Sequence, residues 1–438
     1  MKIIENITFY LILILPFFLI TGPFLPDFAI SLSAIFFLVI FLNTKIKQNY
    51  NKTLIFFFFV INCYLVINSI FSQYTQNSLS ASLFFFRFFI FLLCIYYLFF
   101  FFKSFKNLFF VSLITSFTIL IIDSIFQYFV GYNLLGYSYD KSNHLERLSS
   151  FFGDEKILGN YITKLYPLLF FLLIYNTLLK NNHKLLIFYV ITFLSLVIVI
   201  LSGERTSLVI ISLFIFCSII FIKWQRSQRL IMLLIFFVTI IFMYFNNIQF
   251  YDRIKITLDK THGILADKGL RIYTPTHQSY ILSATKMFVD NKFFGVGPKN
   301  FRKYCNHDKY IITYKQRLEL SGIDNFDDYN TETLNSNVSC STHPHNMHVQ
   351  LLSEVGLIGY LPILYFILYI LKDLFFNFRN LSDGYRIFMF SNLIFLFPIF
   401  PSSNFFSNYN TLFIFINISF FMISHRNKYN QNYEWKKL

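Results

Sequence analysis

The sequence predicts an all-α polytopic membrane protein, on the grounds of its composition, its hydropathy and the spacing of its apolar stretches. Of the 438 residues, 56% are hydrophobic and only 13% are charged. Soluble domains average about 25% charged residues, so this chain has too few polar groups to cover a globular surface in water. The mean hydropathy is +0.56. These values exclude a soluble class and place the chain in a bilayer.

Apolar stretches recur along the chain at the length that a membrane requires. A membrane-spanning helix needs roughly 20 mostly apolar residues, and about twelve stretches approach that length. They lie near residues 7–22, 28–43, 54–71, 83–102, 108–130, 159–179, 185–201, 207–222, 230–246, 348–371, 386–401 and 409–424.

The net charge of +15 is unevenly distributed over the connecting loops. Lys and Arg recur in alternate loops that begin with the N-terminus, whereas the opposite turns at 23–27, 72–82 and 402–408 contain neither. Short loops rich in Lys and Arg mark the cytoplasmic side. We therefore expect both termini to be cytoplasmic.

One polar stretch, 247–347, is much longer than the other connections, and a loop of this length usually has a function. It divides the chain into N-terminal membrane helices (1–246, about nine spans), this large extracytoplasmic loop, C-terminal membrane helices (348–424) and a basic cytoplasmic tail (425–438). Within the loop, 276–290 has apolar residues at helical spacing. The sequence thus predicts a folded excursion between the ninth and tenth spans.

The strongest chemical signal is the run His-Asn-Met-His-Val-Gln-Leu-Leu-Ser-Glu-Val-Gly-Leu-Ile-Gly, which begins at His345 where this loop re-enters the membrane. His345 and His348 would share a helix face, and a neutral imidazole there could accept a proton from a hydroxyl group. The alternative is that these histidines only bond to loop backbone. Gly356 and Gly359 would permit close helix contact.

Arginines on the outer side form the second signal. Arg205 lies in a short turn between two apolar stretches, where a guanidinium is expensive to bury and suits a phosphate group. A structural pair with Glu204 is the alternative. Arg271 precedes the predicted loop helix. Arg87 lies inside an apolar stretch, where snorkelling to lipid phosphate competes with substrate binding.

Neither the spacing of the cysteines nor the placement of the acidic residues indicates a metal site. No cysteine pair has zinc-binding spacing, and the adjacent carboxylates of the polar loop read as solvated charge. Cys305 and Cys340 both lie in the outer loop. An oxidising compartment would permit a disulfide between them, with two free thiols as the alternative. We expect neither a metal nor a cofactor.

Taken in order, these motifs resemble the O-antigen ligase and polymerase superfamily. The resemblance rests on the His-Asn run, the Gly-x-Arg-Thr turn at Arg205, the block from Arg271 to Phe301, and the Arg-Leu-Ser-Ser-Phe-Phe-Gly-Asp segment that begins at Arg147. It implies a GT-C-like helical fold in the bacterial inner membrane, with a large periplasmic loop over the active site. The implied donor is a glycan on undecaprenyl diphosphate, and the implied acceptor is a sugar of the lipid A core or another glycan.

The family's essential residues carry over to three positions. His345 takes the place of the essential histidine, and Arg205 and Arg271 those of two arginines that would hold the diphosphate. Inverting transfer without a metal is then expected, and no nucleic acid is involved. His343 departs from the pattern by placing another imidazole just before the motif. Further residues expected to contact substrate are Arg87, Arg147, Asn346 and His348.

Other functions share part of this pattern. A polymerase and a protein O-oligosaccharyltransferase need the same donor chemistry, so the ligase is favoured only because one long loop precedes a single His-Asn motif. A transporter or flippase of lipid-linked sugars is a further alternative. Transporters usually contain related halves and polar residues at the bilayer midplane, whereas here the polar residues collect on one outer face.

Overall fold

The computed structural model describes residues 1–43, 52–140, 143, 146–258, 273–426 and 428–429, together with the backbone of two short strands. These strands, β1 (Leu265–Ala266) and β2 (Gly269–Leu270), pair antiparallel. Everything below concerns this part of the chain, and the candidate Arg271 lies outside it.

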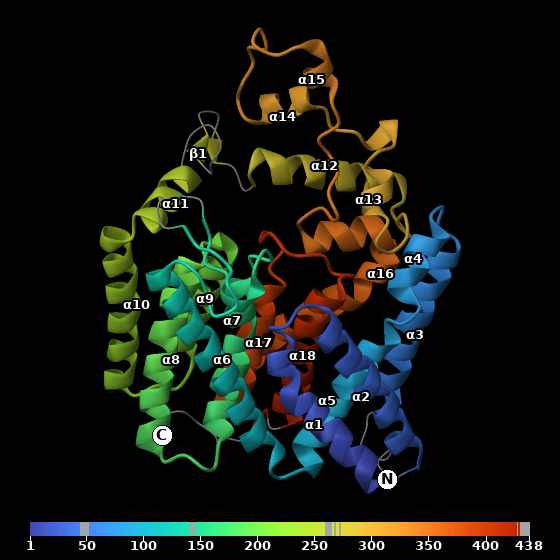
Figure 1. The fold of residues 1–438 in the computed structure, drawn as a ribbon. Coiled ribbons are helices and arrows are strands. Elements are labelled where there is room, and N and C mark those ends of the chain that lie inside the picture. The colour runs from blue at the N-terminus through green and yellow to red at the C-terminus, as the bar shows by residue number, and fades with distance from the viewer. Residues whose placement is uncertain are drawn as a thin grey trace.

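Two groups of helices make up the structure (Figure 1). The bundle contains α1 (Lys2–Phe18), α2 (Phe24–Asn43), α3 (Lys52–Ile70), α4 (Thr75–Ser82), α5 (Phe86–Phe101), α6 (Phe105–Val130), α7 (Leu158–Tyr175), α8 (Asn181–Leu201), α9 (Arg205–Phe221), α10 (Arg226–Asn246), α16 (Met347–Lys372), α17 (Asp383–Phe395) and α18 (Asn408–Arg426). The excursion above it contains α11 (Ile248–Leu258), α12 (Pro275–Asp290), α13 (Phe301–Tyr304), α14 (Tyr314–Leu320) and α15 (Thr331–Asn335).

Each predicted apolar stretch coincides with a helix of the bundle. Within the described ranges, eight helical segments are long and apolar enough to cross a membrane, and α9 is a shorter apolar helix. The all-α polytopic class is therefore confirmed, while a total of about twelve spans stays a prediction.

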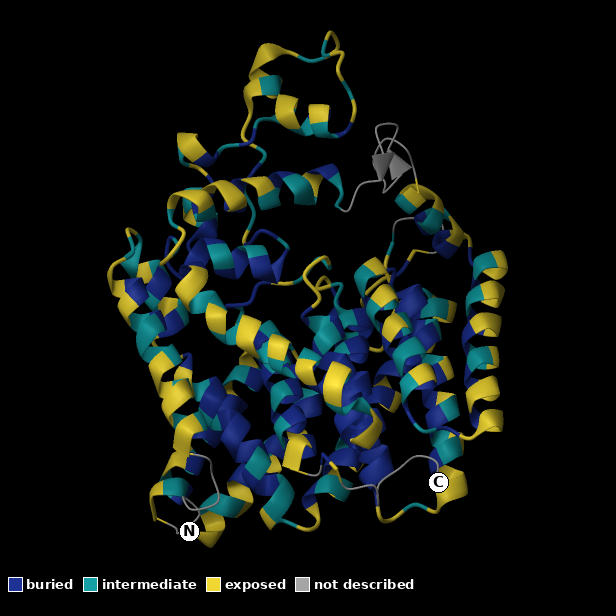
Figure 2. Cartoon of the chain, turned by 180° about the vertical axis from the view of Figure 1, so that it is seen from behind, coloured by how far each residue is buried: buried dark blue, intermediate teal, exposed yellow. Residues whose placement is uncertain are grey.

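Many exposed positions of the bundle, drawn in yellow in Figure 2, carry large apolar side chains. On α10, exposed apolar side chains follow one another at helical spacing, whereas Met232, Phe236 and Met243 face inward. The exposed stripe consists of Leu234, Phe237, Val238, Ile241, Phe242 and Phe245. A helix that is apolar on both faces is stable only where the outer face meets hydrocarbon rather than water.

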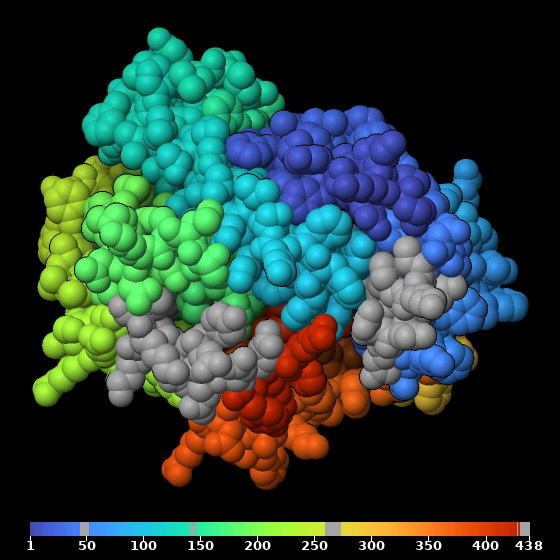
Figure 3. Space-filling model, turned by 90° about the horizontal axis from the view of Figure 1, so that it is seen from below, coloured from blue at the N-terminus to red at the C-terminus, as the bar shows by residue number. Residues whose placement is uncertain are grey.

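The N-terminal and C-terminal membrane helices pack as one bundle. Viewed from below, the red end of α18 lies beside the cyan end of α5 (Figure 3). Arg426 donates to the Tyr96 hydroxyl at 3.4 Å, and its guanidinium lies 4.4 Å from the centre of the Phe100 ring. At the same end, Lys428 pairs with the buried Asp373 at 2.6 Å.

Helix α16 is broken at Gly356, where φ is +64°. A break in a membrane helix frees backbone groups that must find partners inside the protein. The turn after α12 supplies them, because Leu357 N–H donates to the Lys292 carbonyl at 2.8 Å and Val296 N–H donates to the Ser353 carbonyl at 2.9 Å. The excursion is thereby attached to the membrane helix through backbone bonds.

Replacing Gly356 with alanine should lower the free energy of unfolding by at least about 3 kcal/mol. A Cβ atom there would lie 2.3 Å from the backbone of Phe293, and the positive φ adds strain. Thermal unfolding in detergent would measure the loss. Gly22→Ala is the control, since Gly22 also has a positive φ but its Cβ would meet nothing within 4 Å. Equal losses in the two variants would contradict the packing argument.

Candidate functional site

The segment 131–157 is held against α6 by two buried polar side chains. Asp123 accepts hydrogen bonds from Leu134 N–H at 3.0 Å and from the Ser150 hydroxyl at 2.5 Å. Gln127 accepts a further bond from Ser150 N–H at 2.7 Å. Because these contacts fix the loop at Leu134 and at Ser150, they determine where the intervening Arg147 lies.

Arg147, Arg205 and Arg253 form an arginine cluster at the excursion end of the bundle, and each comes from a different segment. Leu148 N–H donates to the Leu201 carbonyl at 3.4 Å, which brings Arg147 beside the turn before α9. Arg205 is the first residue of α9, and Arg253 lies on α11. Burial, followed by the positive charges of Arg147 and Arg205, lowers the pKa of the Arg253 guanidinium.

The cluster leaves two of its guanidinium groups open to a ligand. Arg253 is buried and donates to the carbonyls of Glu146 at 2.6 Å and Gly203 at 3.4 Å. Arg147 and Arg205 are exposed, and neither makes an ion pair or hydrogen bond within the described residues. Neighbouring cations of this kind repel one another and favour a bound anion.

Glu204 does not neutralise Arg205. Its carboxylate caps the start of α7, accepting from Gly159 N–H at 2.6 Å and Asn160 N–H at 3.0 Å. The Ser207 hydroxyl donates to the same carboxylate at 3.0 Å. The structural alternative for Arg205, an ion pair with its neighbour, is therefore not formed.

A histidine cluster, consisting of His277, His343 and His345, lies where the chain enters α16. The His345 ring centre lies 4.1 Å from that of His343 and 4.8 Å from that of His277, on α12. The Tyr280 ring stacks on His345 at 5.5 Å. His345 has a φ of +56°, an uncommon conformation that a well-packed site can maintain.

Burial favours the neutral form of all three imidazoles by lowering their pKa values. Burial, followed by the nearby charge of His277, lowers the pKa of His345 to about 4. Burial and the charge of His345 lower the pKa of His343 to about 3. A buried imidazole is harder to protonate because the cation loses its hydration.

The two motif-region imidazoles differ in how firmly they are held. His343 contacts the Thr342 hydroxyl through Nδ1 at 3.0 Å and the Ser402 carbonyl through Nε2 at 3.2 Å. Within the described residues, the His345 ring has one hydrogen-bond partner, the Ser341 hydroxyl, which lies 3.3 Å from Nε2. His345 is thus the member with a ring nitrogen left for a substrate hydroxyl.

The other polar residues of the motif have structural partners. His348 donates from Nε2 to the Leu396 carbonyl at 2.8 Å, and its Nδ1 lies 2.7 Å from the Tyr360 hydroxyl. Both nitrogens are therefore occupied, in agreement with the backbone-bonding interpretation for this histidine.

Asn346 fixes the start of α16. Its side chain accepts from Val349 N–H at 3.0 Å and donates to the Tyr273 hydroxyl at 2.9 Å and the Pro398 carbonyl at 2.7 Å. An amide with these bonds caps the helix and holds the neighbouring His345 in place.

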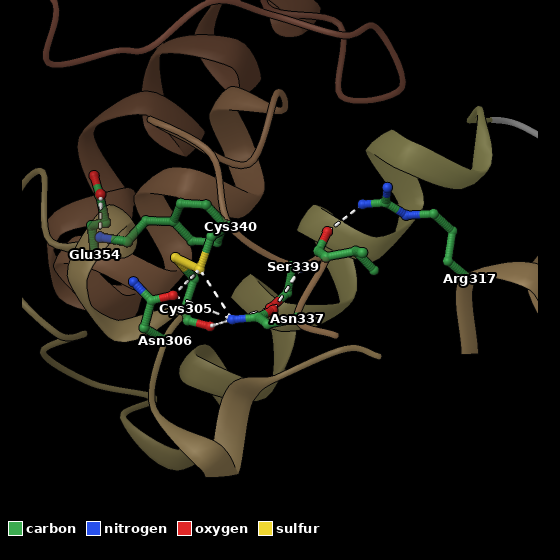
Figure 4. The surroundings of a disulfide bond; sticks show 9 residues. Cys305, Asn306, Arg317, Asn337, Ser339, Cys340 and Glu354 are labelled. Carbon is green, nitrogen blue, oxygen red and sulfur yellow. Dashed lines mark hydrogen bonds between the residues drawn. A yellow bond between two sulfur atoms is a disulfide. The ribbon is translucent and has the colours of Figure 1, made fainter. Parts of the chain in front are cut away.

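Glu354 connects the motif to the turn of the excursion. It is fully buried and accepts from Phe301 N–H at 2.9 Å (Figure 4). Gln350 donates to the other carboxylate oxygen at 2.9 Å and accepts from Phe405 N–H at 2.9 Å. The glutamate of the motif therefore supports the architecture around the histidine cluster.

Cys305 and Cys340 are joined in a disulfide, with Cα atoms 5.2 Å apart (Figure 4). Asn337 donates to the Cys305 carbonyl at 3.1 Å, and Ser339 does so at 3.2 Å. The crosslink therefore attaches the segment that leads to the histidines to the end of α13.

Arg87 is separate from the arginine cluster. It pairs with Asp27 at 2.6 Å and donates to the Ser31 hydroxyl at 3.0 Å, bridging α5 to α2. The guanidinium of Arg87 therefore has partners inside the protein.

Sequence reasoning missed three functional-site neighbours. Arg253 and His277 lie on excursion helices, and their positions depend on packing between segments far apart in the chain. Lys164 on α7 is a charge in an apolar stretch and could have been noticed on that signal alone. Its ammonium donates to Asn410 at 3.3 Å.

The geometry defines a multi-pass helical membrane protein in which arginines and histidines gather where a folded excursion meets the helix bundle. Residues 190–364 match the family model described as O-Antigen ligase. This confirms the resemblance and supports an O-antigen ligase- or polymerase-like activity of the glycosyltransferase type. Comparisons with curated proteins and with solved structures find no match.

Proposed function

We propose that this protein transfers a glycan from undecaprenyl diphosphate to a sugar hydroxyl of the lipid A core at the periplasmic face of the bacterial inner membrane. The main support is that an open arginine cluster and a neutral His345 lie at the same end of the bundle. The outer location of this end and the cytoplasmic location of both termini follow from the distribution of Lys and Arg.

The arginine cluster would bind the diphosphate of the donor. Planar guanidinium groups form paired hydrogen bonds with phosphate oxygens, and Arg147 and Arg205 are exposed to receive them. The buried Arg253 on α11 adds positive charge to the cluster. Arg271, outside the described residues, belongs to this proposal on the resemblance alone. Charge held in this way makes the lipid diphosphate a better leaving group.

His345 would act on the acceptor. As the acceptor oxygen bonds to the anomeric carbon, its proton passes to the imidazole and the bond from that carbon to the diphosphate oxygen breaks. The bonding electrons leave with undecaprenyl diphosphate, and attack opposite to it inverts the anomeric configuration. A neutral imidazole with a pKa of about 4 is a weak base, so the diphosphate supplies much of the driving force.

The rate of transfer should stay level as pH falls from about 8 to about 5, and then decline as His345 is protonated. The sign follows because the neutral imidazole is the active form, and its lowered pKa keeps it neutral until pH approaches about 4. Initial rates across this range would provide the measurement, with intrinsic fluorescence as the control for folding. His277→Ala should move the decline to higher pH, and a wild-type decline centred near 6.5 would contradict the assignment.

Reconstitution with a lipid-linked glycan and lipid A core would test the proposed function. A ligase yields glycan-capped lipid A core, whereas a polymerase yields longer lipid-linked glycan without it. A glycosylated protein product would instead indicate a protein O-oligosaccharyltransferase. Movement of the donor between leaflets with no new glycosidic bond would contradict the enzyme and indicate a flippase.

A further inference from the structure

An open pocket of about 600 Å³ lies between α4 and α13, apart from both clusters. Residues from 73 to 80 line one side, and Lys303 contributes from the other. Its volume is within the range of small-ligand sites, although such sites are mostly apolar. Polar side chains predominate here, which indicates a hydrophilic ligand.

The pocket combines fixed and free polar groups. Asn77 is held by two donated bonds, to the Lys299 carbonyl at 2.9 Å and to the Asn300 side chain at 2.8 Å. The side chains of Gln73, Gln76 and Lys303 form no hydrogen bond with any described residue. Two free amides and one ammonium therefore remain for a ligand.

One wall is a rigid aromatic group. The Tyr74 hydroxyl lies 2.7 Å from Nε2 of His307, and the Tyr74 ring packs edge-on against Tyr304 at 5.4 Å. Tyr304 in turn stacks on His307 at 4.8 Å. A tyrosine ring fixed on two sides offers a preorganised surface beside the free amides.

We infer that this pocket binds the glycan of the acceptor, an inference that rests on the proposed function. Carboxamides both donate and accept hydrogen bonds and so match sugar hydroxyls, which do the same. The pocket has a single cation, too little for a diphosphate, and its described lining includes no acidic side chain for a metal ion. The lone ammonium of Lys303 suits an acidic sugar.

The position of the pocket assigns it to the acceptor rather than to the donor. In Figure 1, α4 lies on one side of the start of α16, while α9 and α11, which carry Arg205 and Arg253, lie on the other. Next to Lys303, Arg302 donates to the Thr342 carbonyl at 3.2 Å, adjacent to His343. A glycan held at α13 would therefore approach the histidines from the side opposite to the donor diphosphate.

Saturation-transfer NMR on the full chain in nanodiscs would test this, with deacylated lipopolysaccharide core oligosaccharide and maltohexaose as probes. We expect transfer to at least one oligosaccharide, and its loss in Gln76→Trp, which fills the pocket. In transfer assays the same variant should raise the acceptor KM about tenfold and leave the donor KM unchanged. Asn335→Trp is the control, because Asn335 is an exposed amide elsewhere on the excursion.

Two results would overturn the inference. One is an absence of saturation transfer from the wild-type protein to both oligosaccharides, and the other is undiminished binding by Gln76→Trp. Failure of the proposed function would look different: the wild-type chain would bind an oligosaccharide in this pocket and yet transfer no glycan.

Discussion

Replacing His345 with alanine should reduce glycan transfer by a factor of about 100 or more, the usual contribution of a positioned acid–base group. Of the three motif-region imidazoles, His345 keeps a ring nitrogen free for a hydroxyl, whereas His343 and His348 use both nitrogens. The measurement is the initial rate with lipid-linked glycan and lipid A core at saturating concentrations. Donor binding should change little, since the arginines lie elsewhere.

A second variant separates proton transfer from orientation. Asn tolerates a positive φ better than most residues, so His345→Asn preserves the local backbone and retains a hydrogen-bond acceptor without a basic nitrogen. Partial activity in His345→Asn would indicate that orientation dominates, and equal loss in both variants would indicate proton transfer. His183→Ala, at an exposed position on α8, is the matched control. Wild-type transfer by His345→Ala, with loss in His343→Ala, would move the role to the neighbouring imidazole.

The membrane helices were predictable because bilayer thickness imposes a length and a composition on each segment independently of its neighbours. Hydropathy along the chain therefore located the long bundle helices without any tertiary information, whereas α4 lies in the stretch 72–82, which the sequence predicts to be a turn. The break in α16 at Gly356 was not predictable in this way. It depends on backbone groups of 292–297, which approach from a segment that hydropathy cannot orient.

Part of the site was predictable because a charged side chain next to an apolar stretch is energetically costly and therefore conspicuous in the sequence. Arg205 could be identified as a candidate because a guanidinium between two apolar stretches is costly and usually has a function. Arg253 gave no such signal, since it lies in a polar segment where arginine is ordinary. Its role depends on Gly203, where a Cβ would come within 2.5 Å of its guanidinium carbon. Only the folded chain makes that contact visible.

Replacing Arg205 with lysine should reduce transfer by a factor of about 100, comparable with the loss of one donor from an oxyanion site. Lysine keeps the charge but has a single ammonium, which cannot form the paired bonds of a planar guanidinium to a phosphate. Arg226→Lys is the matched control, because Arg226 is likewise an exposed first residue of a bundle helix, α10.

The division of this loss between kcat and KM tests when the arginine acts. Negative charge builds on the bridging oxygen only as the anomeric bond breaks, so an arginine aimed at that charge lowers kcat more than it raises the donor KM. A variant with normal kcat and a raised donor KM would show that Arg205 only binds the ground-state diphosphate. Leaving-group stabilisation would then fall to Arg147 and Arg253, the other members of the cluster.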